Sequence, residues 1–262
     1  AEIIPLKDEK YSGGEANKIR VEYKLAYSEA KGKDRILGWN DAAELFYKQL
    51  VITSKKEKSK VTGILKKIKV DKKASEEEKI RKVESYIKTN FIIKEVYSDE
   101  FESVAFIAKN HFGNTKGILK IFLEAFKQLD INTELVMTID RFRKRFDGDF
   151  DTWNYLDEYI IYFPSIDKFL MPGSMFSRLG FVPSEFTCTD GLFIKGVEIG
   201  DLVSGVGKVK NIPCVDYKSN YDNIDATVKF ENDFTETSLH LKRTFTGYGA
   251  MGLQGLYSYL PE

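Results

Sequence analysis

Apolar and polar residues alternate near the start of the chain, and the pattern then changes to helical spacing. From Lys18 to Tyr27 nearly every second residue is apolar, which is typical of a strand with one buried face. Apolar residues then recur at three- and four-residue intervals over 39–50 and 61–68, which predicts two helices. Ser75 is followed by a run of glutamates that forms the start of a capping box, so a third helix is expected to begin there.

A densely apolar helix is predicted from Ile118 to Leu129, directly after a Gly-Asn-Thr-Lys turn over 113–116. Its apolar residues cover most of its circumference, so we expect a central helix that is buried on most sides. A short helical pattern over 103–110 precedes the turn.

The second half of the chain is predicted to be mostly β-structure, and it is strand-like from Gly191 onward. Short apolar runs bounded by turn residues indicate strands over 133–139, 155–163, 169–171, 225–230 and 237–245. The expected fold class is therefore α+β, with helices packed on a sheet and a β-rich C-terminal part.

The composition indicates a folded chain without a strong electrostatic field. With 262 residues, 42% of them hydrophobic and 13% aromatic, the chain can form one or two domains with a substantial core. The 40 lysines and arginines balance 40 aspartates and glutamates, so we expect no nucleic-acid partner. No stretch approaches the roughly 20 apolar residues that span a bilayer. The chain begins with Ala1 and ends among closely spaced glycines, and we expect a processed or truncated product.

The cysteines and histidines do not form a metal-binding pattern. Cys188 and Cys214 stand far apart, and His111 and His240 are at no ligand spacing from them. We therefore expect no metal and no cofactor, since a zinc site would need all four residues to converge. The cysteines form either a disulfide, which would favour an oxidising compartment, or two buried thiols.

Thr115 occupies the point where the turn becomes the central helix. At such a position the helix dipole and the free backbone N–H groups lower the pKa of a cysteine thiol and make it a nucleophile. A threonine hydroxyl ionises far above neutral pH and needs a neighbouring base before it can attack. A structural interpretation accounts for the same residues, because Asn114 or Thr115 would cap the free N–H groups of the helix.

Three segments carry a resemblance to a known family: Trp39-Asn40-Asp41 with Phe46-Tyr47, the run from Lys79 to Phe91, and Phe112-Gly113-Asn114-Thr115-Lys116. They are similar to the bacterial transglutaminase-like proteins, in which β domains of unknown function flank a catalytic domain of papain-like fold. The resemblance implies a papain-like domain over 36–190, with helices packed on an antiparallel sheet. It also implies the tail of an N-terminal β domain over 1–35 and a truncated C-terminal β domain over 191–262.

The resemblance further implies which residues replace the catalytic ones. The turn of the family reads Tyr-Gly-Asp-Cys-Lys, so Thr115 takes the place of the nucleophilic cysteine. The Phe-Asn-His triplet of the family matches Trp-Asn-Tyr at 153–155, so Tyr155 takes the place of the histidine. The Leu-Asp-Pro-Thr motif matches Leu-Met-Pro-Gly at 170–173, so Met171 takes the place of the aspartate. Since tyrosine titrates near about pH 10 and methionine does not titrate, we expect no thiol-type acyl transfer.

The expected function is that of a catalytically inactive transglutaminase-like domain that serves as a binding or scaffolding module. The ligand would be a protein, a peptide or a glycan, and the residues expected to contact it are Asn114, Trp153, Asn154 and His111. The resemblance alone implies a location in the periplasm or at the cell surface.

Two alternatives remain open. A hydrolase or acyltransferase with a relocated active site would require an acid or a base within hydrogen-bond reach of Thr115. A purely structural domain would have a closed cleft, filled by Trp153, Tyr155 and Met171.

Overall fold

Helix α6 (Thr115–Gln128) lies at the centre of the fold, as its dense apolar pattern predicts. The structure is a computed structural model that describes residues 13–257 except 33, 34, 97, 201, 232 and 234. From Gly117 to Phe126 every residue of α6 except Lys120 is buried. Buried apolar area is the main driving force of folding, so this helix organises the core.

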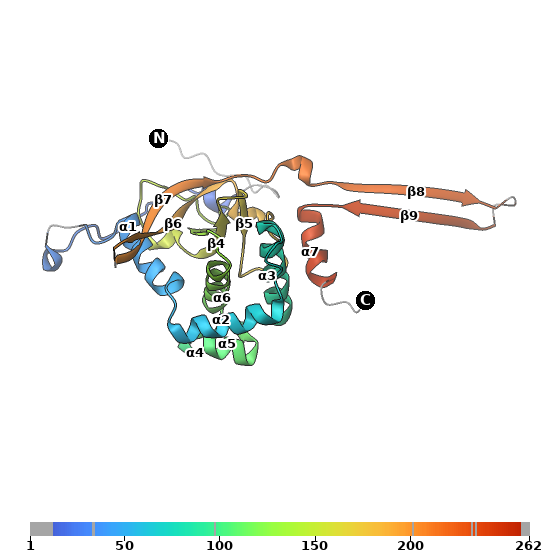
Figure 1. The fold of residues 1–262 in the computed structure, drawn as a ribbon. Helices are drawn as coiled ribbons and strands as arrows, with labels where there is room; N and C mark the ends of the chain where they lie inside the picture. Colours follow the sequence, from blue (N-terminus) through green and yellow to red (C-terminus); the bar gives the residue numbers. More distant parts are fainter. Residues whose placement is uncertain are drawn as a thin grey trace, which may run out of the picture.

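Other helices surround α6 (Figure 1). They are α1 (Trp39–Phe46) with the π turn η3 (Tyr47–Val51), α2 (Lys55–Ile68), α3 (Glu76–Asn90), α4 (Asp99–Glu102) and α5 (Val104–Asn110). Elements η3 and α2 to α5 contact α6. The helices predicted from the sequence are confirmed, although α2 begins earlier than expected. It begins at Lys55 because Ser54 caps it and forms a capping box with Glu57.

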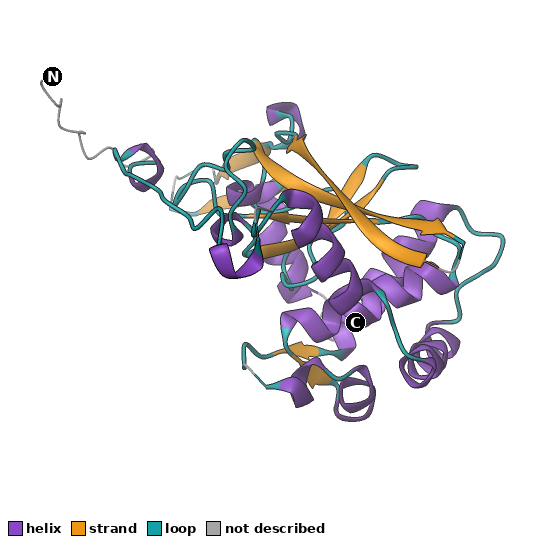
Figure 2. Ribbon diagram, turned by 90° about the vertical axis from the view of Figure 1, so that its left-hand side faces the viewer, coloured by secondary structure: helices purple, strands orange, loops and turns teal. Residues whose placement is uncertain are grey.

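A five-stranded antiparallel sheet packs against these helices, so the fold is α+β as predicted (Figure 2). The spatial order is β5 (Lys168–Leu170), β4 (Glu158–Phe163), β3 (Glu134–Thr138), β6 (Thr189–Ile199) and β7 (Leu202–Ile212). Leu135 and Met137 of β3 join the main core with α6, whereas Val136 between them joins a smaller core on the other face. Both faces of the central strand β3 are therefore shielded from solvent, and all of its residues are buried.

Two glycines allow the start of α6 to lie close to the end of α4. A Cβ atom at Gly117 would lie 2.7 Å from the carbonyl oxygen of Phe101, and one at Gly113 would lie 2.9 Å from it. Both Cβ atoms would also collide with the Ile107 side chain. The backbone N–H of Asn114 donates to the same Phe101 carbonyl at 3.0 Å, so the approach is fixed by a hydrogen bond.

A buried ion pair fastens α3 to the segment after β5. The Lys88 ammonium donates to Glu84 at 2.9 Å and to the carbonyl oxygen of Ser177 at 2.8 Å. The other oxygen of Glu84 accepts from the Leu179 backbone N–H at 3.0 Å. Burial lowers the pKa of Lys88, and the neighbouring Glu84 opposes that shift. Removing one partner would leave the other as an unpaired charge in the core, which is strongly destabilising. The pair therefore holds this segment in one position.

The prediction of a strand from Lys18 to Tyr27 is wrong in the part of the chain that the structure describes. The segment is extended but forms no ladder, and its bridge is the single pair Tyr27–Arg35. Its polar side faces the body, where the Lys24 ammonium donates to Asp151 at 2.8 Å. The apolar residues point to solvent, with exposed fractions of 82% for Ile19 and 90% for Tyr23. The alternation identified the two faces, but the face against the body is the polar one.

The β-rich character predicted for the C-terminal part is observed in two separate places. Strands β6 and β7 pair with each other and belong to the central sheet through the pairing of β6 with β3. The boundary expected between residues 190 and 191 therefore falls inside β6. Beyond them, β8 (Asp222–Phe230) and β9 (Thr237–Phe245) form a hairpin that extends away from the body, followed by helix α7 (Tyr248–Tyr257) (Figure 1). No helix in the described part of the chain is long and apolar enough to cross a membrane.

The β8–β9 hairpin has one apolar and one polar face. Directly paired residues share a face, so the register places alternate pairs together. The mostly apolar face carries Ile224, Ala226, Val228, Phe230, Leu239, Leu241 and Phe245, together with Thr237 and the ion pair of Arg243 with Asp222. The opposite face carries Asn223, Asp225, Thr227, Lys229, Ser238, His240, Lys242 and Thr244. Apolar residues of the first face are well exposed, with 62% for Leu239 and 57% for Ile224.

Cys188 and Cys214 form a disulfide, so the thiol alternative is excluded. The bond joins the residue before β6 to the segment after β7, beside the paired residues Thr189 and Ile212. It closes the β6–β7 hairpin covalently at its open end.

We expect Gly117→Ala to lower the free energy of unfolding by about 1–3 kcal/mol, because the new methyl group must displace the Phe101 backbone or the Ile107 side chain. Gly63→Ala in the exposed part of α2 is the matched control. A Cβ atom there has no neighbour within 4 Å, so this change should raise stability by about 0.5–1 kcal/mol. Urea unfolding of both variants tests the constraint, and equal effects would contradict it.

Candidate functional site

The turn before α6 places Thr115 at the first position of the helix. Asn114 is the N-cap, and its side-chain oxygen accepts from the Gly117 backbone N–H at 2.9 Å. The capping interpretation is thus confirmed for Asn114 rather than for Thr115. Thr115 is half-buried, and a Cβ atom at Gly173 would lie 3.0 Å from its methyl group.

Glu95 lies within hydrogen-bond reach of Thr115. The Thr115 hydroxyl donates to a carboxylate oxygen of Glu95. A short parallel pair brings the two together, because β1 (Ile92–Ile93) runs beside β2 (Phe112–Gly113). The Lys94 backbone N–H donates to the Gly113 carbonyl at 2.8 Å, which sets Glu95 beside the start of the helix. The sequence pattern does not indicate Glu95 as a site residue, because the pairing of two-residue strands leaves no periodic signal.

A cleft of about 470 Å³ opens at this point, and its lining is strongly acidic. Its carboxylates come from Glu95, Glu102, Asp157 and Glu158. The basic residue in the lining is Lys116, whose ammonium lies 3.7 Å from Glu102. Val96, Asn114, Thr115, Leu156 and Tyr159 complete the walls. The cleft therefore has an excess of negative charge that the neutral total composition conceals.

The carboxylates perturb one another. Burial first, and then the negative charges of Asp157 and Glu95, raise the pKa of Glu158 to about 7. Burial and the neighbouring Glu102 raise the pKa of Tyr159 to about 12. Glu158 is therefore partly protonated near neutral pH and can act either as an acceptor or as a donor.

Tyr155 and Met171 are not among the residues that line this cleft with Thr115. Tyr155 is buried against Phe146 and donates its hydroxyl to Glu22 at 2.7 Å. Burial and this contact raise its pKa, so it cannot serve as a base. Met171 belongs to the smaller core on the other face of the sheet. The start of β4 contributes Glu158 and Tyr159 to the cleft, and β4 begins later than the predicted strand, which starts at Tyr155.

The other candidate binding residues are divided among different places. Asn114 lines the acidic cleft, whereas Trp153 and Asn154 line a neighbouring pocket of about 460 Å³ with Arg143 and Lys144. Asp157 lines both, so the two pockets adjoin. Trp153 is 45% exposed and meets Phe46 edge-on.

His111 is not placed at Thr115. It ends α5 in a left-handed conformation, stacks on Phe91 with ring centroids 5.0 Å apart, and hydrogen-bonds the Asn90 carbonyl at 3.0 Å. This is the capping role of a structural histidine. Among the described residues there is no group of three or more histidine, cysteine, aspartate or glutamate side chains that could hold a metal ion.

We expect Glu158→Gln to change how stability depends on pH. The pKa of Glu158 rises from its usual 4.5 to about 7 in the folded state, so the folded state binds this proton more tightly than the unfolded chain. The stabilising contribution is present at low pH and is lost as the pH rises toward 7. Urea unfolding at about pH 5 and about pH 8 should show the variant gaining stability relative to the wild type at the higher pH. Glu44→Gln, in an exposed pair with Lys48, should show no such gain, and a pH-independent difference for Glu158→Gln would contradict the assignment.

Comparison with known proteins gives no neighbour for this arrangement: no family model, no curated protein and no solved structure matches the chain.

Proposed function

We propose that the chain is a non-catalytic binding module whose acidic cleft receives a cationic group of a peptide or protein, such as a lysine or arginine side chain. The observation that carries the proposal is the concentration of Glu95, Glu102, Asp157 and Glu158 around one cleft with Lys116 as its basic residue. Charges of one sign in a concave site concentrate ligands of the opposite sign.

The arrangement around Thr115 supports binding more than acyl transfer. A general base works best when its pKa lies near the working pH and it touches the proton to be removed. Burial and neighbouring charges raise the pKa of Glu158 to about 7, but among the described residues no hydrogen bond joins Glu158 to the Thr115 hydroxyl, which donates to Glu95. Tyr155 is held by Glu22, and Met171 lies in the other core, so neither supports a proton shuttle.

The disulfide supports a location outside the reducing cytosol. Disulfides form and persist in oxidising compartments and are rare in cytosolic proteins. Together with the resemblance to transglutaminase-like proteins, it favours the periplasm or the cell surface.

The hydrogen bond from Thr115 to Glu95 supports a second candidate function, which is a hydrolase or acyltransferase with a relocated active site. It supplies the acidic partner that such an enzyme requires beside the hydroxyl. In this case Thr115 would be the nucleophile, Glu95 would orient or deprotonate it, and Glu158 would exchange a proton with the leaving group.

Binding of charged peptides tests the first function. We expect a lysine-rich peptide to bind more tightly than a glutamate-rich peptide of the same length, as measured by fluorescence anisotropy. The double variant Glu95→Gln/Glu102→Gln should weaken binding at least about tenfold, because two of the cleft charges are removed. Glu44→Gln removes a charge outside the cleft and should leave binding unchanged. Equal affinity for the two peptides would overturn the proposal.

Activity assays separate the two candidates. We expect neither the wild type nor Thr115→Cys to hydrolyse peptides or incorporate amines, because the surrounding carboxylates raise the pKa of a thiol at this position. Turnover by the wild type that Thr115→Val abolishes would instead establish the second candidate.

A further inference from the structure

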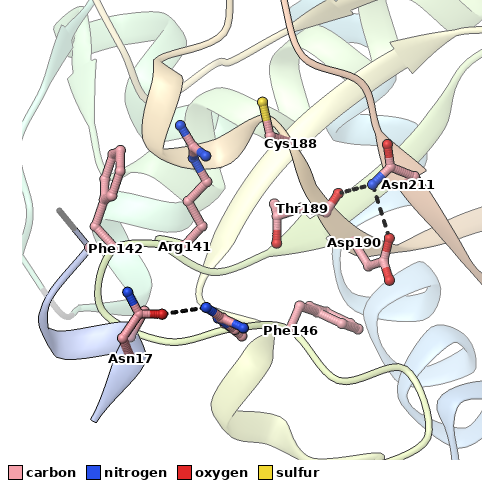
Figure 3. A pocket seen from close by; sticks show the side chains of 11 residues that line it. Asn17, Arg141, Phe142, Phe146, Cys188, Thr189, Asp190 and Asn211 are labelled. Atoms are coloured by element: carbon pink, nitrogen blue, oxygen red, sulfur yellow. Dashed lines mark hydrogen bonds between the residues drawn. The ribbon is translucent and has the colours of Figure 1, made fainter. Parts of the chain in front are cut away.

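We propose a second binding site, for a small organic anion with a carboxylate or phosphate group, in a pocket that shares no lining residue with the acidic cleft (Figure 3). The pocket has a volume of about 410 Å³, which is within the usual size of small-molecule sites. It lies between the short helix η1 (Glu15–Asn17), the loop after β3 that carries Arg141 and Arg145, and the ends of β6 and β7 that the disulfide joins.

Arg141 is held in place by the main chain. Its backbone N–H donates to the Glu185 carbonyl at 2.9 Å, and its Nε donates to the Ser184 carbonyl at 3.0 Å. Its guanidinium also stacks on Phe142, 4.6 Å from the ring centroid. These contacts fix the side chain and leave both terminal nitrogens as donors for a ligand.

Arg145 lines the same pocket and is oriented by the Asn17 side chain, whose oxygen accepts from its terminal nitrogen. Within the described ranges, neither Arg141 nor Arg145 forms an ion pair with a carboxylate. Arg143, between them, does pair with Asp157, at 3.9 Å. Two arginines without an acidic partner in one pocket leave positive charge for an anion to neutralise.

The opposite side of the pocket limits the charge of the ligand. The Asp190 carboxylate accepts from the Asn211 side chain at 3.2 Å, and the same amide donates to the Thr189 carbonyl at 3.2 Å. Figure 3 shows Arg141 and Asp190 on opposite sides of Thr189. An anionic group is therefore favoured at the arginine side and repelled at the Asp190 side.

Aromatic side chains give the pocket an apolar wall. Phe142 is 40% exposed, and Phe146 and Ala16 also line the pocket. The guanidinium fork matches the planar carboxylate and the phosphate group in a bidentate manner. The ligand class that fits is an anionic head group on an apolar or aromatic body.

Calorimetric titration with phenyl phosphate, benzoate and inorganic phosphate tests the site. We expect phenyl phosphate or benzoate to bind at least about tenfold more tightly than inorganic phosphate, because the apolar body contacts the phenylalanine wall. Whichever of phenyl phosphate and benzoate binds more tightly identifies whether the site prefers a phosphate or a carboxylate group. Absence of binding by all three probes would overturn the proposal.

Three variants assign the binding to these residues. Arg141→Gln/Arg145→Gln should weaken binding at least about tenfold, and Arg143→Gln, the matched control, should leave it unchanged. Asp190→Asn should strengthen binding, because it removes the opposing charge and keeps an acceptor for Asn211. The Asp190 variant also provides a test that does not depend on the folding of the double variant. Equal affinities of wild type and Asp190→Asn, or equal losses in the Arg143 and Arg141/Arg145 variants, would contradict the site.

Discussion

The close contact between the start of α6 and the carbonyl oxygen of Phe101 determines where the chemistry of this protein is located. Glycine at 113 and 117 permits that contact, and the Asn114 backbone N–H completes it. Because α6 is buried over most of its length, a shift at its first turn would disturb the whole core. The same contact fixes Thr115 beside Glu95 and so defines one wall of the acidic cleft.

A chain with zero net charge has nevertheless separated its charges locally. Acidic groups gather at the start of α6, while Arg141 and Arg145 gather at the ends of β6 and β7. In the core, by contrast, Lys88 and Glu84 form a buried ion pair that fastens the segment after β5. Unpaired and like-charged groups cost stability, so their concentration in two concave sites is a physical argument for ligands at both.

The sequence predicts local features well and distant contacts poorly. The helical periodicity and the cap at Asn114 depend on neighbouring residues, and both are found where the pattern indicates. Glu95 and Glu158 reach Thr115's cleft only through strand pairing, which the sequence pattern does not specify. The family motifs align Tyr155 and Met171 with the catalytic positions, but β4 begins only at Glu158, so Glu158 rather than Tyr155 enters the cleft, and Met171 follows the end of β5 and packs in the smaller core. The alternation from Lys18 to Tyr27 was real, but its burial could not be inferred without knowing that Asp151 attracts the polar face.

The two-faced β8–β9 hairpin has a consequence for how the protein loses its structure. Every residue of β8 is exposed, and a two-stranded ribbon without a covering layer is marginally stable in water. The body, in contrast, is closed around α6 and braced by the disulfide. We therefore expect the hairpin to open as a separate unfolding unit at low free-energy cost, while the sheet and helices stay folded. On this basis its exposed backbone amides should exchange hydrogen with solvent earlier than those of the buried strand β3.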